Sequence, residues 1–193
     1  GFETEYIFDI TPSEQDGLNA LKAEEDFHED PVNVALYGCY DFLYKLDEAE
    51  DIVNTCEGIN GLIQKHIVKC LERKEISKNI PAITEISDGV SSFVRAQYET
   101  FPYPRWNNVL SPYANEPLMQ PFKNRPLDML IAGCGTGAEA ASIASGFPTS
   151  TVLAVDLSTA SLSYGIQRSR ELGIDNIDFR HGVILKLGTI DKK

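Results

Sequence analysis

The chain has 193 residues, of which 24% are charged and 42% hydrophobic, and its formal net charge is −12. This composition is typical of a folded globular protein and excludes collagen-like and wholly disordered chains. No segment approaches the roughly 18 apolar residues of a membrane-spanning helix, so no membrane partner is expected. The N-terminus shows no signal-type apolar segment, which favours a cytoplasmic location.

The negative charge is concentrated at the beginning of the chain. Residues 1–60 contain 16 acidic and two basic side chains, whereas residues 61–193 contain 13 acidic and 15 basic ones. Because an acidic surface repels phosphate groups, contact with nucleic acid through the N-terminal third is not expected. The nearly neutral remainder is compatible with an anionic ligand.

The cysteines and histidines form no metal-binding pattern. The four cysteines contain no Cys-x-x-Cys pair, and the three histidines are scattered along the chain. We therefore predict no metal site, and we expect reduced, mostly buried cysteines.

Residues 1–100 are predicted to form an acidic helical region that serves as a cap or lid. Thr11-Pro12-Ser13-Glu14 has the pattern of a helical N-terminus with a capping box, and Asp30-Pro31 opens a second helix in a similar way. Further helices are expected at about 48–56, 62–73 and 87–98.

Residues 101–126 have a different composition. They contain six of the ten prolines and the single tryptophan, Trp106. Proline at this density is incompatible with a helix or a central strand, so the segment is predicted to be a connecting arm.

From Leu127 onward, strands and helices alternate. Strands are predicted at 127–132, 151–156 and 177–180, and helices at 138–145 and 158–172. This order indicates an α/β fold with an incomplete Rossmann-like parallel sheet of about three strands over residues 127–193.

A glycine-rich turn follows the first of these strands. It reads Gly133-Cys134-Gly135-Thr136-Gly137, and Asp156 ends the next strand 19 residues after Gly137. Such a turn lets the backbone approach a ligand closely, and a carboxylate at that distance can accept hydrogen bonds from ribose hydroxyls. The pattern predicts a nucleoside-containing cofactor.

Two cofactor classes use this geometry. Gly133, Gly135 and Ala138 satisfy a relaxed dinucleotide fingerprint, whereas Gly133, Gly135 and Gly137 satisfy Gly-x-Gly-x-Gly. The run Ala-Gly-Cys-Gly-Thr-Gly, followed by Leu-Ala-Val-Asp-Leu-Ser at 153–158, resembles class I S-adenosylmethionine-dependent methyltransferases. Residues 97–106, Gln-Tyr-Glu-Thr-Phe-Pro-Tyr-Pro-Arg-Trp, resemble a segment of a bacterial group of these enzymes that is often fused to tetratricopeptide repeats.

The resemblance implies roles for individual residues. The turn residues Gly133 to Gly137, Cys134 and Thr136 included, would line S-adenosyl-L-methionine. Asp156 would bind the ribose hydroxyls, and Leu157 would pack on the adenine. Tyr98 and Arg105 would close over the cofactor; the alternatives are a tyrosine that packs between helices and an arginine in a surface ion pair.

The sequence departs from the family pattern in three places. The acid expected two residues before the first glycine is Ile131, and the acid expected to contact adenine aligns with Val183. The sequence also stops after about three strands where a complete sheet of this class has seven, so we expect a fragment. An exposed sheet edge would then favour self-association.

These observations favour an enzyme that transfers a methyl group from S-adenosylmethionine to an unidentified acceptor. No catalytic residue can be named from the sequence. Two alternatives remain open at this stage: a nicotinamide-dependent oxidoreductase, and a non-catalytic interaction module with a relic cofactor turn.

Overall fold

The computed structural model describes residues 9–85, 102, 104–110, 116–117 and 119–189. Two compact units are distinguished, residues 1–72 and residues 73–193. The helix predicted at 87–98, and Tyr98 with it, lies outside the described residues. The division into a cap, an arm and a sheet domain at residues 100 and 126 stays a prediction. No helix among the described residues is long and apolar enough to cross a membrane.

The first unit consists of short helices. They are α1 (Pro12–Lys22), α2 (Pro31–Gly38), α3 (Ala49–Thr55), α4 (Asn60–Ile63), a π-helical stretch (Gln64–Val68) and α5 (Lys69–Lys78), which runs on into the second unit. The helix predicted at 62–73 is thus confirmed and continues to Lys78. A short 3-10 turn, Leu43–Lys45, lies between α2 and α3.

Both predicted helix starts are confirmed. The Thr11 hydroxyl accepts a hydrogen bond from the Glu14 N–H at 3.3 Å, and the Glu14 carboxylate accepts the Thr11 N–H at 2.9 Å. The Asp30 carboxylate accepts the N–H of Val32 at 2.8 Å. These bonds satisfy N–H groups that have no partner within the helix.

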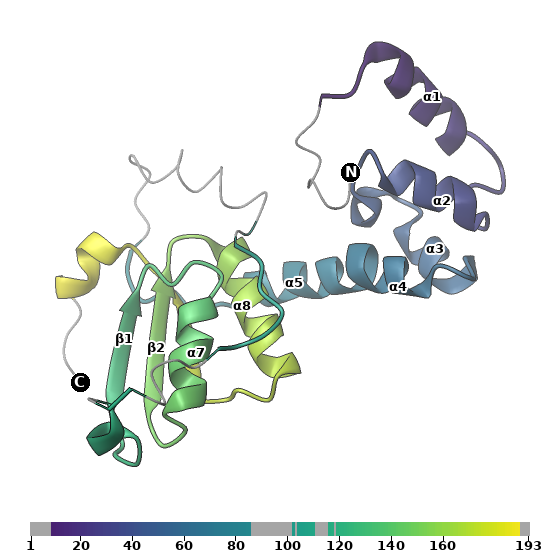
Figure 1. The fold of residues 1–193 in the computed structure, drawn as a ribbon. Helices are drawn as coiled ribbons and strands as arrows, with labels where there is room; N and C mark the ends of the chain where they lie inside the picture. The colour runs from purple at the N-terminus through teal and green to yellow at the C-terminus, as the bar shows by residue number, and fades with distance from the viewer. Residues whose placement is uncertain (1–8, 86–101, 103, 111–115, 118, 190–193) are drawn as a thin grey trace. The chain divides into compact units, whose positions relative to one another are not determined.

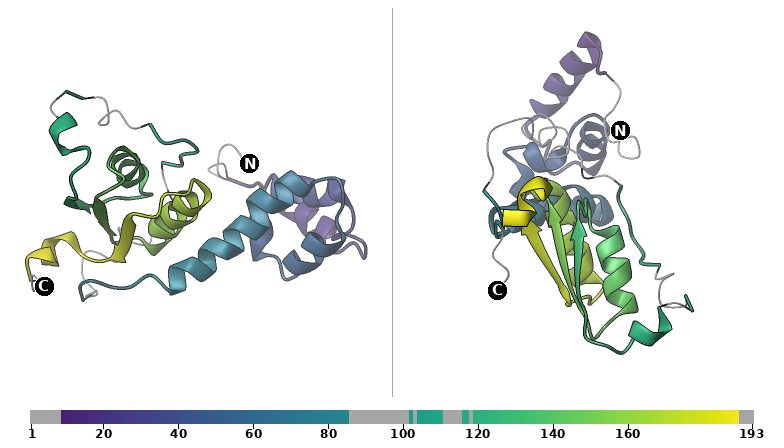
Figure 2. Two further views of the ribbon diagram at one scale, coloured as in Figure 1. Left: turned by 90° about the horizontal axis from the view of Figure 1, so that it is seen from below. Right: turned by 90° about the vertical axis from the view of Figure 1, so that its left-hand side faces the viewer.

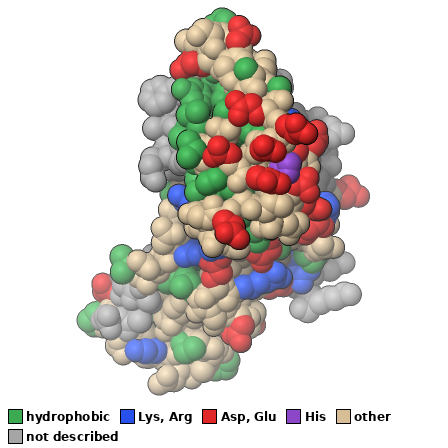
Figure 3. Space-filling view, turned by 90° about the vertical axis from the view of Figure 1, so that its right-hand side faces the viewer, with side chains coloured by type: hydrophobic (Ala, Val, Ile, Leu, Met, Phe, Trp, Pro, Cys, Tyr) green, Lys and Arg blue, Asp and Glu red, His purple; other side chains and the backbone are tan. Residues whose placement is uncertain are grey.

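A small apolar core holds this unit together. It is formed by Phe27, Val34, Leu43, Leu46, Ala49, Ile52, Cys56, Ile63 and Ile67. Acidic side chains gather over one face of the unit, as Figure 3 shows in red. Among the described residues of this unit no acidic side chain is buried, so their charge lies at the surface.

The second unit is built on a three-stranded parallel sheet (Figure 1). Its strands β1 (Asp128–Ala132), β2 (Thr151–Asp156) and β3 (Ile177–His181) are arranged in the order β1-β2-β3. The crossover helices are α7 (Ala138–Gly146) and α8 (Thr159–Glu171). The predicted α/β class is confirmed.

Both crossover helices cover the same face of the sheet (Figure 2). Successive right-handed crossovers in one direction place them there. Buried residues of the helices and strands form the core between them, among them Ala140, Ala144, Val152, Ala154, Leu162 and Phe179. On β1 the exposed positions alternate with half-buried ones, and Leu130 is 55% exposed.

The strand register brings the carboxyl ends of the strands together. Ala132 pairs with Val155, and Asp156 pairs with His181. The glycine turn after β1, the carboxylate at the end of β2 and the residues after β3 therefore share one edge of the sheet. This is the edge at which open α/β sheets bind ligands.

The two outer edges of the sheet differ. Beside β3, the Pro81 carbonyl accepts the His181 N–H at 3.0 Å, and the His181 carbonyl accepts the Ile83 N–H at 2.8 Å. Beside β1, no strand pairs among the described residues. Self-association through the β1 edge stays a prediction.

Helix α8 lies unusually close to the glycine turn at Gly165. A Cβ at this position would lie 2.8 Å from the Thr136 carbonyl oxygen and 3.0 Å from the ring of Phe179. Only glycine fits this approach of helix to turn without displacing backbone.

We predict that Gly165→Ala destabilises the second unit by about 1–3 kcal/mol, because the added methyl group overpacks the helix against the turn. Denaturant unfolding followed by the fluorescence of Trp106, the only tryptophan, measures this. The matched control is Gly188→Ala, whose Cβ meets no atom within 4 Å. Equal midpoints for the two variants would show that the contact at Gly165 is unimportant.

Candidate ligand site at the carboxyl edge of the sheet

The glycine turn has the backbone conformation that its three glycines permit. Gly133, Gly135 and Gly137 have φ angles of 80°, 54° and 79°, in the left-handed region that favours glycine. Ala138 is the first residue of α7. The three positions of the turn at which the backbone favours glycine are therefore those of the Gly-x-Gly-x-Gly pattern.

The three glycines differ in what lies beside them. A Cβ on Gly133 would lie 3.1 Å from Ile184, and one on Gly137 would lie 2.9 Å from Phe179. A Cβ on Gly135 would meet nothing within 4 Å. The middle of the turn therefore faces open space, as a ligand that rests on the turn requires.

Asp156 ties the end of β2 to this turn. Its Oδ2 accepts the Gly135 N–H at 2.8 Å, and its Oδ1 accepts the Ser158 N–H at 2.9 Å. An ionised carboxylate has about four lone-pair positions, so each oxygen can still accept one further hydrogen bond. A vicinal diol such as that of ribose supplies two donors at matching separation.

The proline-rich arm is fastened onto the turn through Thr136, which is 2% exposed. The Thr136 hydroxyl donates to the Pro104 carbonyl at 2.6 Å, and the Trp106 indole N–H donates to the Thr136 carbonyl at 2.8 Å. One turn residue thus holds the arm at two points that flank Arg105.

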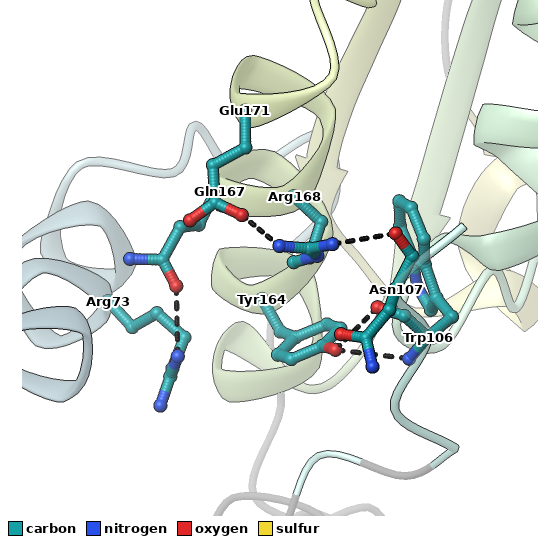
Figure 4. Close-up of polar contacts among 7 residues, drawn as sticks. All are labelled: Arg73, Trp106, Asn107, Tyr164, Gln167, Arg168 and Glu171. Carbon is teal, nitrogen blue, oxygen red and sulfur yellow. Dashed lines mark hydrogen bonds and ion pairs between the residues drawn. The ribbon is translucent and has the colours of Figure 1, made fainter. Parts of the chain in front are cut away.

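Helix α8 holds the other side of the arm (Figure 4). The Tyr164 hydroxyl donates to the Trp106 carbonyl at 2.8 Å and accepts the Trp106 N–H at 3.0 Å. Arg168 donates to the Asn107 carbonyl at 2.8 Å and pairs with Glu171. These contacts were not foreseen from the sequence, although an isolated tryptophan between prolines is the signal that could have suggested them.

Arg105 is exposed, between the two points at which the arm is bonded to the turn. This position places its backbone beside the glycine turn. A role for its guanidinium toward a cofactor stays a prediction, and so does the role of Tyr98, which lies outside the described residues.

Cys134 turns its side chain into the core and not toward the edge of the sheet. It is 9% exposed and belongs to the apolar core between the sheet and the two crossover helices. Burial, with a smaller contribution from the Asp156 charge, raises the pKa of Cys134 to about 12. The side chain is therefore a neutral thiol near neutral pH, and only the backbone of Cys134 is available to a ligand.

The residues after β3 complete the edge. The His181 Nε2 lies 2.9 Å from the Leu157 carbonyl, which can only accept, so this nitrogen carries the hydrogen. The Gly182 N–H donates to the Asp156 carbonyl at 3.0 Å. These two hydrogen bonds tie Asp156 and Leu157 to the end of the third strand. Leu157 is half-buried, and its packing on adenine stays a prediction.

Within the described part of the chain, no three His, Cys, Asp or Glu side chains are grouped so that they could hold a metal ion. A groove of about 560 Å³ lies at the far end of α8 and β3, lined by residues such as Arg170, Gly173 and Ile177. Neither Asp156 nor any residue of the glycine turn lines this groove, so it is separate from the candidate ligand site.

Comparison with known proteins points to one family. Residues 124–193, about a third of the chain, match the family model described as "Methyltransferase domain". The match covers all three strands, the glycine turn and Asp156. Among curated proteins, none matches the chain significantly.

Solved structures that match include the crystal structure of coclaurine N-methyltransferase bound to N-methylheliamine and SAH. The identity is 13%, the match covers 59% of this chain and 36% of that one, and the TM-score is 0.27. A TM-score of this size carries no argument about fold or function.

We predict that Cys134 resists alkylation in the native protein, because the thiolate is the reactive form and a pKa of about 12 leaves almost none near pH 8. Exposed Cys39 is the internal control. Mass spectrometry after iodoacetamide treatment should find Cys39 labelled first and Cys134 labelled only in denaturant. Labelling of both at equal rates would contradict the burial of Cys134.

We predict that Thr136→Val destabilises the second unit by about 0.5–1.5 kcal/mol, since it removes the half-buried hydrogen bond to the Pro104 carbonyl. Thr136→Ser keeps the hydroxyl and should lose less. Unfolding followed by Trp106 fluorescence measures both. Two variants of equal stability would show that the hydroxyl does not fasten the arm.

Proposed function

We propose that this chain carries the cofactor-binding half of an S-adenosylmethionine-dependent methyltransferase, and that S-adenosylmethionine binds across the carboxyl edge of β1, β2 and β3. The cofactor that the family match implies is S-adenosylmethionine. The methyl acceptor is left open, because no described residue is placed to select one.

The observation that carries the proposal is the pairing of Gly135 with Asp156. The turn presents an open backbone surface at Gly135, and the carboxylate bonded to that residue keeps one accepting position on each oxygen. A ligand that bears a ribose diol can therefore satisfy the carboxylate while its 5′ substituent lies along the turn.

The residues beside the turn fit this cofactor in polarity. The turn has no side chain over Gly135, and the neighbouring side chains Leu157 and Ile184 are apolar and partly exposed. Apolar side chains beside a carboxylate suit a ligand with a flat base on one side of a ribose. Of the two alternatives considered from the sequence, neither gains support from the family match.

When bound, S-adenosylmethionine supplies an activated methyl group: the acceptor's lone pair forms the new bond to carbon as the carbon–sulfur bond breaks, and sulfur keeps that electron pair. The task of this chain is to orient the cofactor and to shield one side of it. The arm fastened at Thr136 supplies a fixed wall for this purpose, and Arg105 on that arm would face the cofactor carboxylate.

The test is calorimetric titration with S-adenosylhomocysteine. We expect binding in the micromolar range, weakened about 10- to 100-fold by Asp156→Asn, because an amide cannot replace both charge-assisted hydrogen bonds. The control is Asp128→Asn. It makes the same charge change on the same sheet, at the opposite end of β1, where the side chain is exposed.

Binding by the parent chain and by Asp128→Asn, with loss in Asp156→Asn, supports the proposal. Equal weakening in the two variants would show a general charge effect. Absence of binding by the folded parent chain would refute cofactor binding by this part of the protein.

A further inference from the structure

A short segment that precedes the sheet in sequence pairs alongside the end of its third strand, at the ligand edge. Ala82 forms an isolated parallel bridge with His181. The two hydrogen bonds of this bridge join His181 to the Pro81 carbonyl and to the Ile83 N–H. A Cβ on Gly182 would lie 2.7 Å from Ile83, so the segment is packed tightly at this point. Lys186 donates to the Glu85 carbonyl at 3.1 Å and fixes the far end.

Thr84 follows these residues and brings a hydroxyl group to the end of β3. Its Oγ1 accepts the Val183 N–H at 2.8 Å, and the residue is half-buried. A hydroxyl has one hydrogen and two lone pairs, so the Thr84 Oγ1 has a hydrogen to donate and a second lone pair to accept with. Val183 itself has no polar side-chain atom, and its amide hydrogen is already bonded.

The order of groups along the edge indicates where a base would lie. The glycine turn follows β1, and Asp156 ends β2. Val183 follows β3, and its N–H is bonded to Thr84. In a nucleoside the 5′ substituent and the base are attached at opposite ends of the ribose, at C4′ and C1′. With the ribose on Asp156 and the 5′ substituent over the turn, the base would extend toward β3, at the end of which Thr84 is bonded to Val183.

We propose that the Thr84 hydroxyl is the group that recognises the Watson–Crick edge of the adenine, so that a residue outside the matched family segment 124–193 completes the nucleoside site. Adenine presents an acceptor at N1, to which the Thr84 hydroxyl would donate its hydrogen. This inference rests on the proposed function, because it needs the ribose to lie on Asp156.

The experiment compares two changes to the ligand in two variants of the chain. The 1-deaza analogue of S-adenosylhomocysteine lacks the N1 acceptor of the Watson–Crick edge, whereas the 7-deaza analogue lacks only N7, which lies on the Hoogsteen edge. We expect the parent chain to prefer S-adenosylhomocysteine over the 1-deaza analogue about tenfold, and Thr84→Val to reduce this preference to about twofold. Thr84→Ser keeps the hydroxyl and should keep the preference.

The preference, and not the affinity, is the readout, because loss of the bond to Val183 could weaken all ligands equally. In both chains the 7-deaza analogue should follow S-adenosylhomocysteine. A Thr84→Val variant that keeps the full tenfold preference would overturn the role of Thr84, while binding that still depends on Asp156 would leave the proposed function intact. Absence of binding by the parent chain would overturn both.

Discussion

The hydrogen bond from the Gly135 N–H to the Asp156 carboxylate joins the turn after β1 to the end of β2. It depends on two properties of the sequence: a left-handed backbone at Gly135, which turns the amide toward the neighbouring strand, and a register that ends β2 at Asp156. A charged acceptor makes this bond stronger than a neutral one. The carboxylate is thereby held in place before any ligand arrives, and the cost of ordering it on binding is reduced.

The residue next to this bond fastens the rest of the unit. Thr136 bonds the proline-rich arm through its hydroxyl and through its carbonyl, and Tyr164 on α8 holds the same arm at Trp106. Gly165 lets α8 approach the Thr136 carbonyl to a distance that any side chain would prevent. Hydrogen bonds thus join the arm to the turn and to α8, and Figure 4 shows those between the arm and the helix.

Local signals in the sequence predicted the elements well, because caps, prolines and glycines act over a few residues. The start of α1 at Thr11 and Pro12, the three strands and the glycine turn are confirmed. Contacts between distant segments leave no comparable local trace. The bonds from Trp106 to Thr136 and from Val183 to Thr84 join residues 30 and 99 positions apart, and neither follows from spacing or periodicity. Cys134 illustrates the same limit: the motif places it in the turn, but only the packing shows its thiol in the core.

Hydrogen–deuterium exchange with and without S-adenosylhomocysteine tests most directly whether a cofactor lies across the carboxyl edge of the sheet. The account predicts slower exchange in peptides that contain residues 133–137, 156–158 and 182–184, which carry the turn, the carboxylate and the end of the third strand. Helix α1 and the start of β1 should exchange at unchanged rates. Protection confined to the N-terminal unit, or the same protection with NADH in place of S-adenosylhomocysteine, would contradict it.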